Sequence, residues 1–164
     1  MTTATTTSTE RPAVEPEPIL RVEDLHVRYG GSHILQGVSF DVPAKGVTAL
    51  LGRNGVGKTT TLKAILGLAP RTGRVSLGGE DVTRWSVTRT VREGVGYVPE
   101  DREVFGGLTG DGRGVLMVEH HMDVVLDLAD RVAVMHHGTL LACDSPDAVM
   151  ADATVQEAYV GEAL

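Results

Sequence analysis

Apolar and polar residues alternate in short runs along the first part of the chain, which is the pattern of β-structure. The alternation predicts one strand over residues 20–27, which ends at Gly30-Gly31, and a second strand over residues 34–42. The next run, residues 47–51, is largely apolar and ends at a glycine. A short apolar run of this kind predicts a strand that is buried on both faces of a sheet.

A helical pattern follows this buried strand. From Lys58 onward, apolar residues recur at the spacing of a helix, and Pro70 ends the pattern because proline cannot continue a helix. The next elements predicted are a strand over residues 74–77, a short helix over residues 86–93, a strand over residues 95–98 and a loop over residues 100–114.

The C-terminal third also alternates between strands and helices. The elements predicted there are a strand over residues 115–118, a helix over residues 122–129 and a hairpin of residues 131–135 and 139–143. Ser145-Pro146 indicates a helix start, and Thr154 with Glu157 matches a capping box in which Thr154 caps a last helix. Strands that alternate with helices predict the α/β class, with a parallel sheet flanked by helices.

Composition narrows the function classes. Residues 1–18 are rich in Thr, Pro and Glu, and they predict a disordered tail before one domain of residues 19–164. The net charge of −7 argues against a nucleic-acid groove, which needs a basic face. Cys143 is the single cysteine, so we expect a reducing compartment and no internal disulfide. No apolar run is long enough to span a bilayer, so we expect any membrane link to run through a partner protein.

Residues 52–59, the phosphate loop, match the pattern G-x-x-x-x-G-K-T at every fixed position. Glycines let the backbone curl so that its N–H groups point at phosphate oxygens, while Lys58 reaches the β- and γ-phosphates. The Thr59 hydroxyl is a ligand for Mg²⁺, and the helix that starts here adds its positive end. The alternative is a glycine-rich turn with a chance lysine, but the strand before it and the helix after it favour phosphate binding.

At this point the chain resembles the ATP-binding subunits of ABC transporters. Residues 51–60 are similar to their Walker A motif, and residues 25–30 to their adenine-stacking loop, in which Tyr29 would offer its ring to the base. Outside that frame, Tyr29 is a half-buried strand aromatic. The nucleotide-binding residues that the resemblance implies are Tyr29, Gly52, Arg53, Asn54, Gly55, Val56, Gly57, Lys58, Thr59 and Thr60.

Two further segments extend the resemblance. Residues 95–105 are similar to branched-chain amino acid importer subunits, and Glu100 stands where most of the family has the Gln of the Q-loop. A carboxylate there would hold Mg²⁺ with Thr59 or position water; otherwise it is a solvated loop charge. Residues 115–123 resemble the switch-histidine segment, which implies that His120 contacts the γ-phosphate, although a histidine at a strand end is more often structural.

The remaining histidines carry weaker signals. His121, His136 and His137 are expected to be ordinary surface residues. Paired histidines suggest a metal site, but no cysteine or carboxylate cluster in the sequence supports one.

The resemblance implies an ABC-type P-loop NTPase core, with an N-terminal antiparallel β region and the helical subdomain missing. It covers residues 19–105 and 115–164, which are joined only by residues 106–114, where the family carries its signature motif, Walker B strand and D-loop. No Asp-Glu dipeptide and no Ser-Gly-Gly occurs in the chain. Hydrolysis is therefore predicted to be impaired, because the Walker B Asp that would support Mg²⁺ and the Glu that would polarise the attacking water are both missing.

The missing Walker B strand raises two questions: whether Glu119 takes the place of its carboxylate, and how the sheet closes without it. Glu119 follows an apolar run as a Walker B carboxylate does, but that role would displace His120 from its matched position. Without the Walker B strand, either residues 95–98 pair with residues 115–118, or an edge of the sheet stays exposed.

The function that the resemblance implies is the ATP-binding subunit of a branched-chain amino acid importer, with ATP and Mg²⁺ as cofactors. Its implied partners are membrane permease subunits and a second ABC ATPase subunit, and its implied place is the cytoplasm, on the inner face of the membrane. A non-hydrolysing nucleotide-binding module or a degenerate product of such a gene are the alternatives. A GTPase is disfavoured, because Asn54 is the only asparagine and the guanine-reading Asn-Lys-x-Asp motif is absent.

Overall fold

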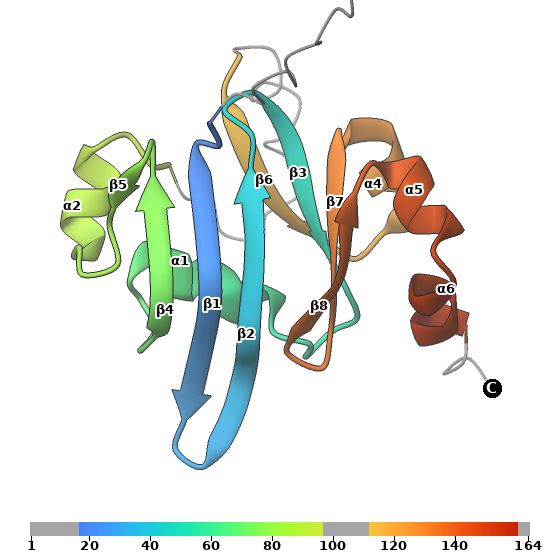
Figure 1. The fold of residues 1–164 in the computed structure, drawn as a ribbon, viewed down its shortest axis with the longest axis horizontal. Helices are drawn as coiled ribbons and strands as arrows, with labels where there is room; N and C mark the ends of the chain where they lie inside the picture. Colours follow the sequence, from blue (N-terminus) through green and yellow to red (C-terminus); the bar gives the residue numbers. More distant parts are fainter. Residues whose placement is uncertain (1–16, 97–111, 161–164) are drawn as a thin grey trace, which may run out of the picture.

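Two β-sheets pack against each other at the centre of the molecule (Figure 1). The computed structural model describes residues 17–96 and 112–160. The antiparallel sheet has the order β2-β1-β4-β5, with strands β1 (Leu20–Tyr29), β2 (Ser32–Val42), β4 (Thr72–Leu77) and β5 (Glu80–Asp81). The second sheet has the order β6-β3-β7-β8, with strands β3 (Gly46–Leu51), β6 (Gly114–Glu119), β7 (Arg131–His136) and β8 (Thr139–Asp144).

The second sheet is parallel around its central strand. β3 pairs in parallel with β6 on one side and with β7 on the other, while β8 returns antiparallel from β7 as a hairpin. The helices are α1 (Lys58–Leu66), α2 (Val87–Arg92), α4 (Met122–Leu128), α5 (Pro146–Ala151) and α6 (Ala153–Val160). The predicted α/β class, with an N-terminal antiparallel region beside a parallel core, is confirmed.

Successive residues of β3 point into two different hydrophobic cores, because side chains alternate along a strand. Leu50 belongs to the core between the two sheets, where α1 also packs. Val47, Ala49 and Leu51 belong to the core on the opposite face, under α4, α5 and α6. Burial on both faces explains why β3 is largely apolar rather than alternating.

Most predicted elements are present, and the pairing of β6 bears on the alternatives that the sequence left open. Val95 and Gly96 lie outside any strand, so that half of the predicted strand over residues 95–98 is wrong; Tyr97 and Val98 lie outside the described residues. Among the residues that the structure describes, β6 pairs with β3 alone. The predicted tail also lies outside the described residues, except for Glu17 and Pro18.

The start of α6 corrects the predicted capping box. Helix α6 begins at Ala153, so Thr154 lies inside it. The carboxylate of Asp152 accepts the N–H groups of Thr154 at 2.8 Å and of Val155 at 3.1 Å. Asp152 therefore caps the helix, because one carboxylate oxygen satisfies two of its unpaired first-turn donors.

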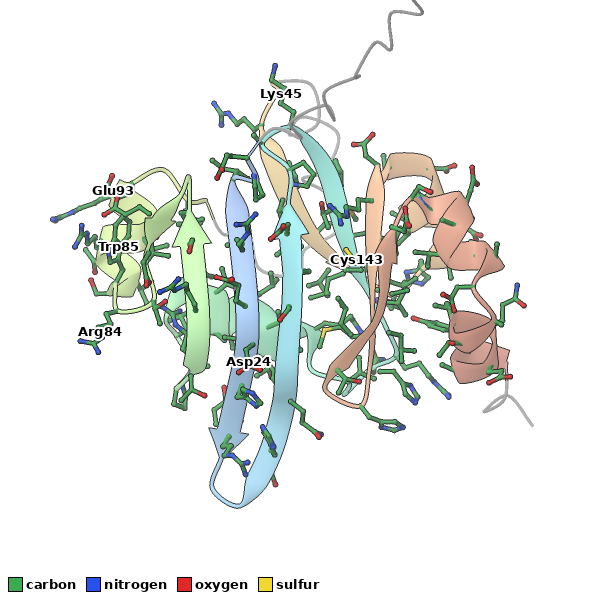
Figure 2. The ribbon with its side chains drawn as sticks, in the orientation of Figure 1. Asp24, Lys45, Arg84, Trp85, Glu93 and Cys143 are labelled. Atoms are coloured by element: carbon green, nitrogen blue, oxygen red, sulfur yellow. The ribbon has the colours of Figure 1, made fainter. Side chains whose placement is uncertain are left out.

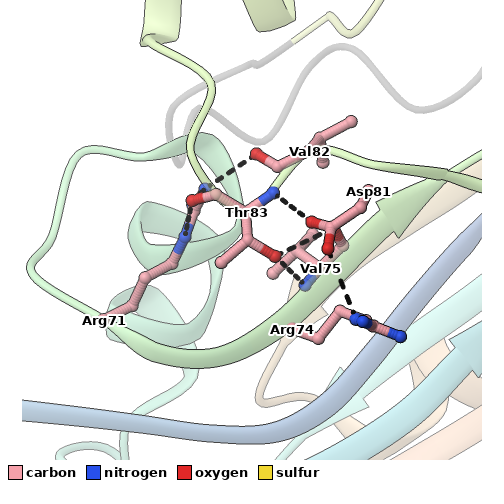
Figure 3. Close-up of polar contacts among 6 residues, drawn as sticks. All are labelled: Arg71, Arg74, Val75, Asp81, Val82 and Thr83. Carbon is pink, nitrogen blue, oxygen red and sulfur yellow. Dashed lines mark hydrogen bonds and ion pairs between the residues drawn. The ribbon is translucent and has the colours of Figure 1, made fainter.

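Arg71 fastens the C-terminal end of α1 to the segment between β5 and α2 (Figure 3). Its guanidinium group donates to the carbonyl oxygens of Ala64 and Ile65 in the last turn of α1. It also donates to the oxygens of Thr83 at 2.6 Å and of Val82 at 3.2 Å. The planar group of several donors thus satisfies carbonyls that the end of a helix leaves open.

The side chains labelled in Figure 2 lie in different parts of the molecule. Arg84, Trp85 and Glu93 lie around α2 at one margin of the molecule, while Cys143 lies on β8 nearer the middle. Cys143 packs against the core between the sheets. Within the described ranges, no helix has the length and apolar character needed to cross a membrane.

Candidate functional site

The phosphate loop lies between the carboxyl end of β3 and the start of α1. β3 ends at Leu51, and α1 begins at Lys58. In a parallel sheet the carboxyl ends of neighbouring strands meet at one edge, and ligands bind at such edges. The position of the loop is therefore the one expected for a binding site.

Two glycines allow the loop to pack as tightly as it does. Gly57 has φ 106°, and a Cβ atom there would lie 2.7 Å from Cδ2 of Leu35. A Cβ atom at Gly52 would lie 2.7 Å from Cγ2 of Val56 and 2.8 Å from the carbonyl oxygen of Met135. Both contacts are too short for a carbon atom, so any side chain at either position would push the loop away from its neighbours.

Lys58 holds the loop in a closed arc. Its ammonium group donates to the carbonyl oxygens of Gly52 at 2.6 Å and Arg53 at 2.8 Å. The residue is only 7% exposed. A buried ammonium ion needs acceptors or an anion beside it, since burial without such partners is costly. The loop thus keeps one positive charge at the first turn of α1.

The first turn of α1 is suited to an anion. Gly57 is its N-cap, no described side chain caps this turn, and its first turn contains no acidic residue. The backbone N–H groups of a helix start carry partial positive charge and bind phosphate readily. Together with the Lys58 ammonium group, these donors fit a polyphosphate, and the exposed Thr59 at the same turn carries the hydroxyl that suits Mg²⁺.

Thr61 is a structural residue of the site that the sequence analysis missed. Its hydroxyl donates to the carbonyl oxygen of Gly57 at 2.8 Å and lies 3.6 Å from the sulfur of Met135. Thr61 is fully buried. It thereby ties the first turn of α1 to β7, and the only signal in the sequence was a run of threonines at the helix start.

The turn between β7 and β8 ties the phosphate loop to the other sheet. The N–H group of Gly138 donates to the carbonyl oxygen of Val56 at 3.1 Å. In return, the N–H group of Gln36 donates to the oxygen of Gly138 at 2.9 Å, and the Gln36 amide donates to the oxygen of His137 at 3.3 Å. Loop, turn and β2 therefore form one hydrogen-bonded joint, which the sequence pattern did not reveal.

His120 lies at the same edge of the sheet as the phosphate loop. Leu51 of β3 is paired with Glu119 of β6, so the residues that follow each strand, Gly52 and His120, leave the sheet beside each other. The His120 side chain is 47% exposed. The structure thus places His120 at the same edge of the sheet as the phosphate loop, and its contact with a γ-phosphate stays a prediction.

Glu119 is engaged by the backbone that follows it. One carboxylate oxygen accepts the N–H groups of His120 at 2.8 Å and His121 at 2.9 Å, and lies 3.0 Å from Nδ1 of His121. Burial raises the pKa of Glu119, but these N–H groups and the His121 imidazole lower it, and the net pKa lies below its ordinary value. The group is therefore an ionised carboxylate at neutral pH.

Tyr29, Arg53 and Asn54 are other predicted site residues that the structure describes. Tyr29 ends β1 at the tip of the β1–β2 hairpin and is 44% exposed, so its ring is accessible. The β2 residue that packs against the phosphate loop at Gly57 is Leu35, which lies further along the strand from the hairpin tip. Arg53 and Asn54 are exposed at the loop surface. Glu100 lies outside the described residues, so its predicted role stays a prediction.

Comparison of the sequence with known families gives a match to ABC transporter over residues 35–154. The chain is 38% identical over 103 residues to a "Probable ABC transporter ATP-binding protein" of Azorhizobium caulinodans, a match that covers 62% of this chain and 34% of that protein. It is 38% identical over 92 residues to a "Probable branched-chain amino acid transport ATP-binding protein LivF" of Archaeoglobus fulgidus (56% of this chain, 39% of that one).

A third relative has a different transport role in its name. Over 92 residues the chain is 34% identical to a "Lipopolysaccharide export system ATP-binding protein LptB" of Haemophilus influenzae, covering 56% of this chain and 38% of that protein. The chain therefore spans between 34% and 39% of the length of these three relatives.

The fold has close counterparts among solved structures. A nucleotide-free ATP-binding cassette from an ABC transporter superposes with a TM-score of 0.75, covering 89% of this chain and 100% of that chain, at 20% identity. At this identity the likeness is one of fold.

Proposed function

Because the chain belongs to the ABC transporter family, we propose that it binds the magnesium complex of ATP at the phosphate loop, residues 52–59. The observation that carries this proposal is the buried Lys58 ammonium group, which donates to the Gly52 and Arg53 carbonyls inside the loop. A triphosphate would replace those carbonyls as the partner of Lys58. The helix start behind it supplies further donors.

The remaining residues of the site have separate parts in this proposal. The Thr59 hydroxyl is a ligand for Mg²⁺, the ion that neutralises charge between the β- and γ-phosphates in such sites. The Tyr29 ring stacks on the adenine, and the His120 imidazole donates to the terminal phosphate. Glu100, at the position of the Q-loop, is the second oxygen ligand proposed for the metal.

We further propose that hydrolysis is weak in this chain. Hydrolysis needs a carboxylate that orients the attacking water as well as a positioned phosphate. The sequence contains no Asp-Glu pair. One oxygen of the Glu119 carboxylate, which ends the strand next to β3, accepts the N–H groups of His120 and His121, and the lowered pKa of this group makes it a weak base toward water. Binding without turnover is the result that this arrangement favours.

The test is a calorimetric titration of the protein with Mg-ATP, with Lys58→Ala as the variant and Lys63→Ala as its control. Both lysines lie on α1, but Lys63 is exposed in the last turn. We expect Lys58→Ala to weaken binding roughly 10- to 100-fold, the scale of a charge-assisted hydrogen bond, and Lys63→Ala to leave it unchanged. Equal affinity in all three proteins would refute the phosphate-loop proposal.

Turnover is measured on the same samples as steady-state phosphate release. We expect ATP to stabilise the protein against heat while phosphate release stays at the level of the Lys58→Ala variant. Release well above that level would show that this chain carries a hydrolysis site and would end the binding-only proposal.

A finer candidate function is the ATP-binding subunit of a branched-chain amino acid importer, working with permease subunits and a second ATPase subunit. Its support is the similarity to LivF, together with the segment of residues 95–105. The similarity to LptB is nearly as strong and names a different transported substance. The deciding measurement is whether the chain restores leucine uptake in bacteria that lack their own importer ATPases; restored lipopolysaccharide export instead would reject this candidate.

A further inference from the structure

The carboxyl end of β6 gathers one carboxylate and two imidazoles into a single cluster. Glu119, His120 and His121 each offer one ligand atom, and these atoms all lie within 4.8 Å of one another. No other group of three such side chains comes this close among residues 17–96 and 112–160. The paired histidines alone did not predict a metal site, because no cysteine or carboxylate cluster accompanied them in the sequence; in the structure Glu119 joins His120 and His121.

The donor atoms converge on one oxygen of Glu119. That oxygen lies 3.0 Å from Nδ1 of His121 and 3.4 Å from Nδ1 of His120. The two imidazole rings are tilted at 43° to each other, with centroids 3.9 Å apart. In a tetrahedral zinc site with ligand distances near 2.1 Å, neighbouring ligand atoms lie about 3.4 Å apart. The separation of Glu119 from His120 matches that spacing, and the shorter separation from His121 is that of the hydrogen bond between the two groups.

Backbone hydrogen bonds hold this arrangement in place. The same Glu119 oxygen accepts the N–H groups of His120 and His121 at 2.8 and 2.9 Å. The Glu119 side chain is 13% exposed, while those of His120 and His121 are 47% and 51% exposed. The carboxylate is thus largely buried and held in one position, whereas the two imidazoles are open to solvent.

We propose that Glu119, His120 and His121 bind one divalent transition-metal ion of the Zn²⁺ class. Two imidazole nitrogens with one carboxylate oxygen form a ligand set that Zn²⁺ prefers, whereas Mg²⁺ and Ca²⁺ prefer oxygen ligands alone. In the metal-bound state each imidazole presents an unprotonated Nδ1 to the ion and carries its proton on Nε2. For His121 this means that the proton that Nδ1 donates to Glu119 is released and the ring is protonated on Nε2 instead. The hydrogen bond between His121 and Glu119 is then replaced by coordination of both groups, and water occupies the fourth position.

This metal site is separate from the nucleotide proposal, although the two share His120. The ion would be held through atoms that face Glu119, and none of the three ligands belongs to the phosphate loop. Binding of the metal alone is therefore expected without nucleotide, and Lys58→Ala is expected to leave it unchanged.

The test is a titration of metal-free, untagged protein with Co²⁺, followed by its visible absorption, and then by displacement with Zn²⁺. We expect saturable binding of a single ion. His121→Asn and Glu119→Gln should each weaken Co²⁺ binding at least about tenfold, the scale expected when one group of a metal site is lost.

The chain offers a matched control in His136 and His137. Their rings also lie close together, with centroids 4.0 Å apart, but no described carboxylate forms a cluster with them. The double variant His136→Asn/His137→Asn should bind Co²⁺ as tightly as the unaltered protein.

Two results would overturn the proposal: no saturable Co²⁺ binding, or affinity that stays unchanged in His121→Asn. Loss of binding in the His136→Asn/His137→Asn control alone would also overturn it, because the ion would then lie on the other pair. Circular dichroism checks that each variant is folded. If Glu119→Gln unfolds, His121→Asn decides the question, since it keeps Glu119 and the backbone N–H groups that hold it.

Discussion

Lys58 determines the shape of the phosphate loop before any ligand is bound. Its ammonium group is buried and satisfied by two loop carbonyls, so its charge is already placed at the start of α1. Placing the charge in advance reduces the ordering that a ligand must induce, and this favours affinity. The motif alone identified Lys58 in the sequence, and the two glycine positions that the motif fixes, Gly52 and Gly57, are positions at which a Cβ atom would clash in the structure.

Tyr29 offers a test of base recognition that leaves phosphate recognition intact. The ring is 44% exposed at the hairpin tip. Stacking on an aromatic ring is worth about 1–3 kcal/mol per base. We therefore expect Tyr29→Ala to weaken ATP binding roughly 5- to 100-fold but to leave inorganic triphosphate binding unchanged, both measured by calorimetry. Tyr29→Phe is the control and should retain ATP affinity; an equal loss for ATP and triphosphate would contradict a stacking role.

Cys143 should be a slow thiol in the folded protein. Burial raises its pKa, and the nearby Arg131 offsets only part of this effect. Because the thiolate is the reactive form, a raised pKa leaves less of it at a given pH. At about pH 8 we expect a disulfide reagent such as dithionitrobenzoate to react with native Cys143 at least ~10-fold more slowly than with the urea-unfolded chain. Equal rates in both states would show that the thiol is open to solvent.

At the scale of elements, helix ends were harder to predict than helix interiors. Ser145-Pro146 was predicted correctly, because Ser145 accepts the N–H group of Ala148 at 3.3 Å and proline occupies the first position. The last helix was predicted with the wrong cap. Asp152 and Thr154 are both good capping residues, and the choice between them depends on where α5 ends, which local sequence does not specify.

Paired variants at these two positions measure the corrected cap. We expect Asp152→Ala to lower the free energy of unfolding by about 1 kcal/mol, because two N–H groups of α6 lose their acceptor. Thr154→Ala should change it by less than about 0.5 kcal/mol, since it lies within the helix. Urea titration followed by circular dichroism gives both values. A larger cost at Thr154 than at Asp152 would restore the capping box.

Two sets of hydrogen bonds at the site, those of Gly138 and those of Glu119, could not be predicted from the sequence for a different reason. Gly138 and Val56 lie far apart in the chain, and their contact depends on how the two sheets pack. Glu119 shows the same limit: its position after a buried strand was evident, but its engagement with the next two N–H groups was not. Contacts that depend on the packing of distant segments leave no local pattern.

At the scale of the whole molecule, the parallel sheet carries the candidate site and the antiparallel sheet packs against it. The parallel sheet carries the phosphate loop and His120 at one edge, and cores cover both of its faces. The antiparallel sheet contacts that edge through Leu35 and Gln36 of β2. The overall arrangement could be predicted from the alternation of strands and helices, whereas the strand order could be expected only from the family resemblance.

The strand order leads to a prediction about local stability. β3 is hydrogen-bonded on both sides, while β6 has a described partner on one side only. We expect amide hydrogens of β6 that point away from β3 to exchange at least ~10-fold faster than those of β3, measured by hydrogen–deuterium exchange. Equal protection in the two strands would show that another segment covers the β6 edge.

The attachment that Arg71 makes at the end of α1 has a practical consequence. It joins the helix to the carbonyls of Val82 and Thr83, just ahead of Trp85, whose ring carries the Arg89 guanidinium 4.0 Å from its centroid. Trp85 is the only tryptophan in the chain. The single tryptophan is therefore attached to the far end of the helix whose first turn is proposed to bind the phosphates, and its emission offers a dye-free optical signal for occupancy of the loop.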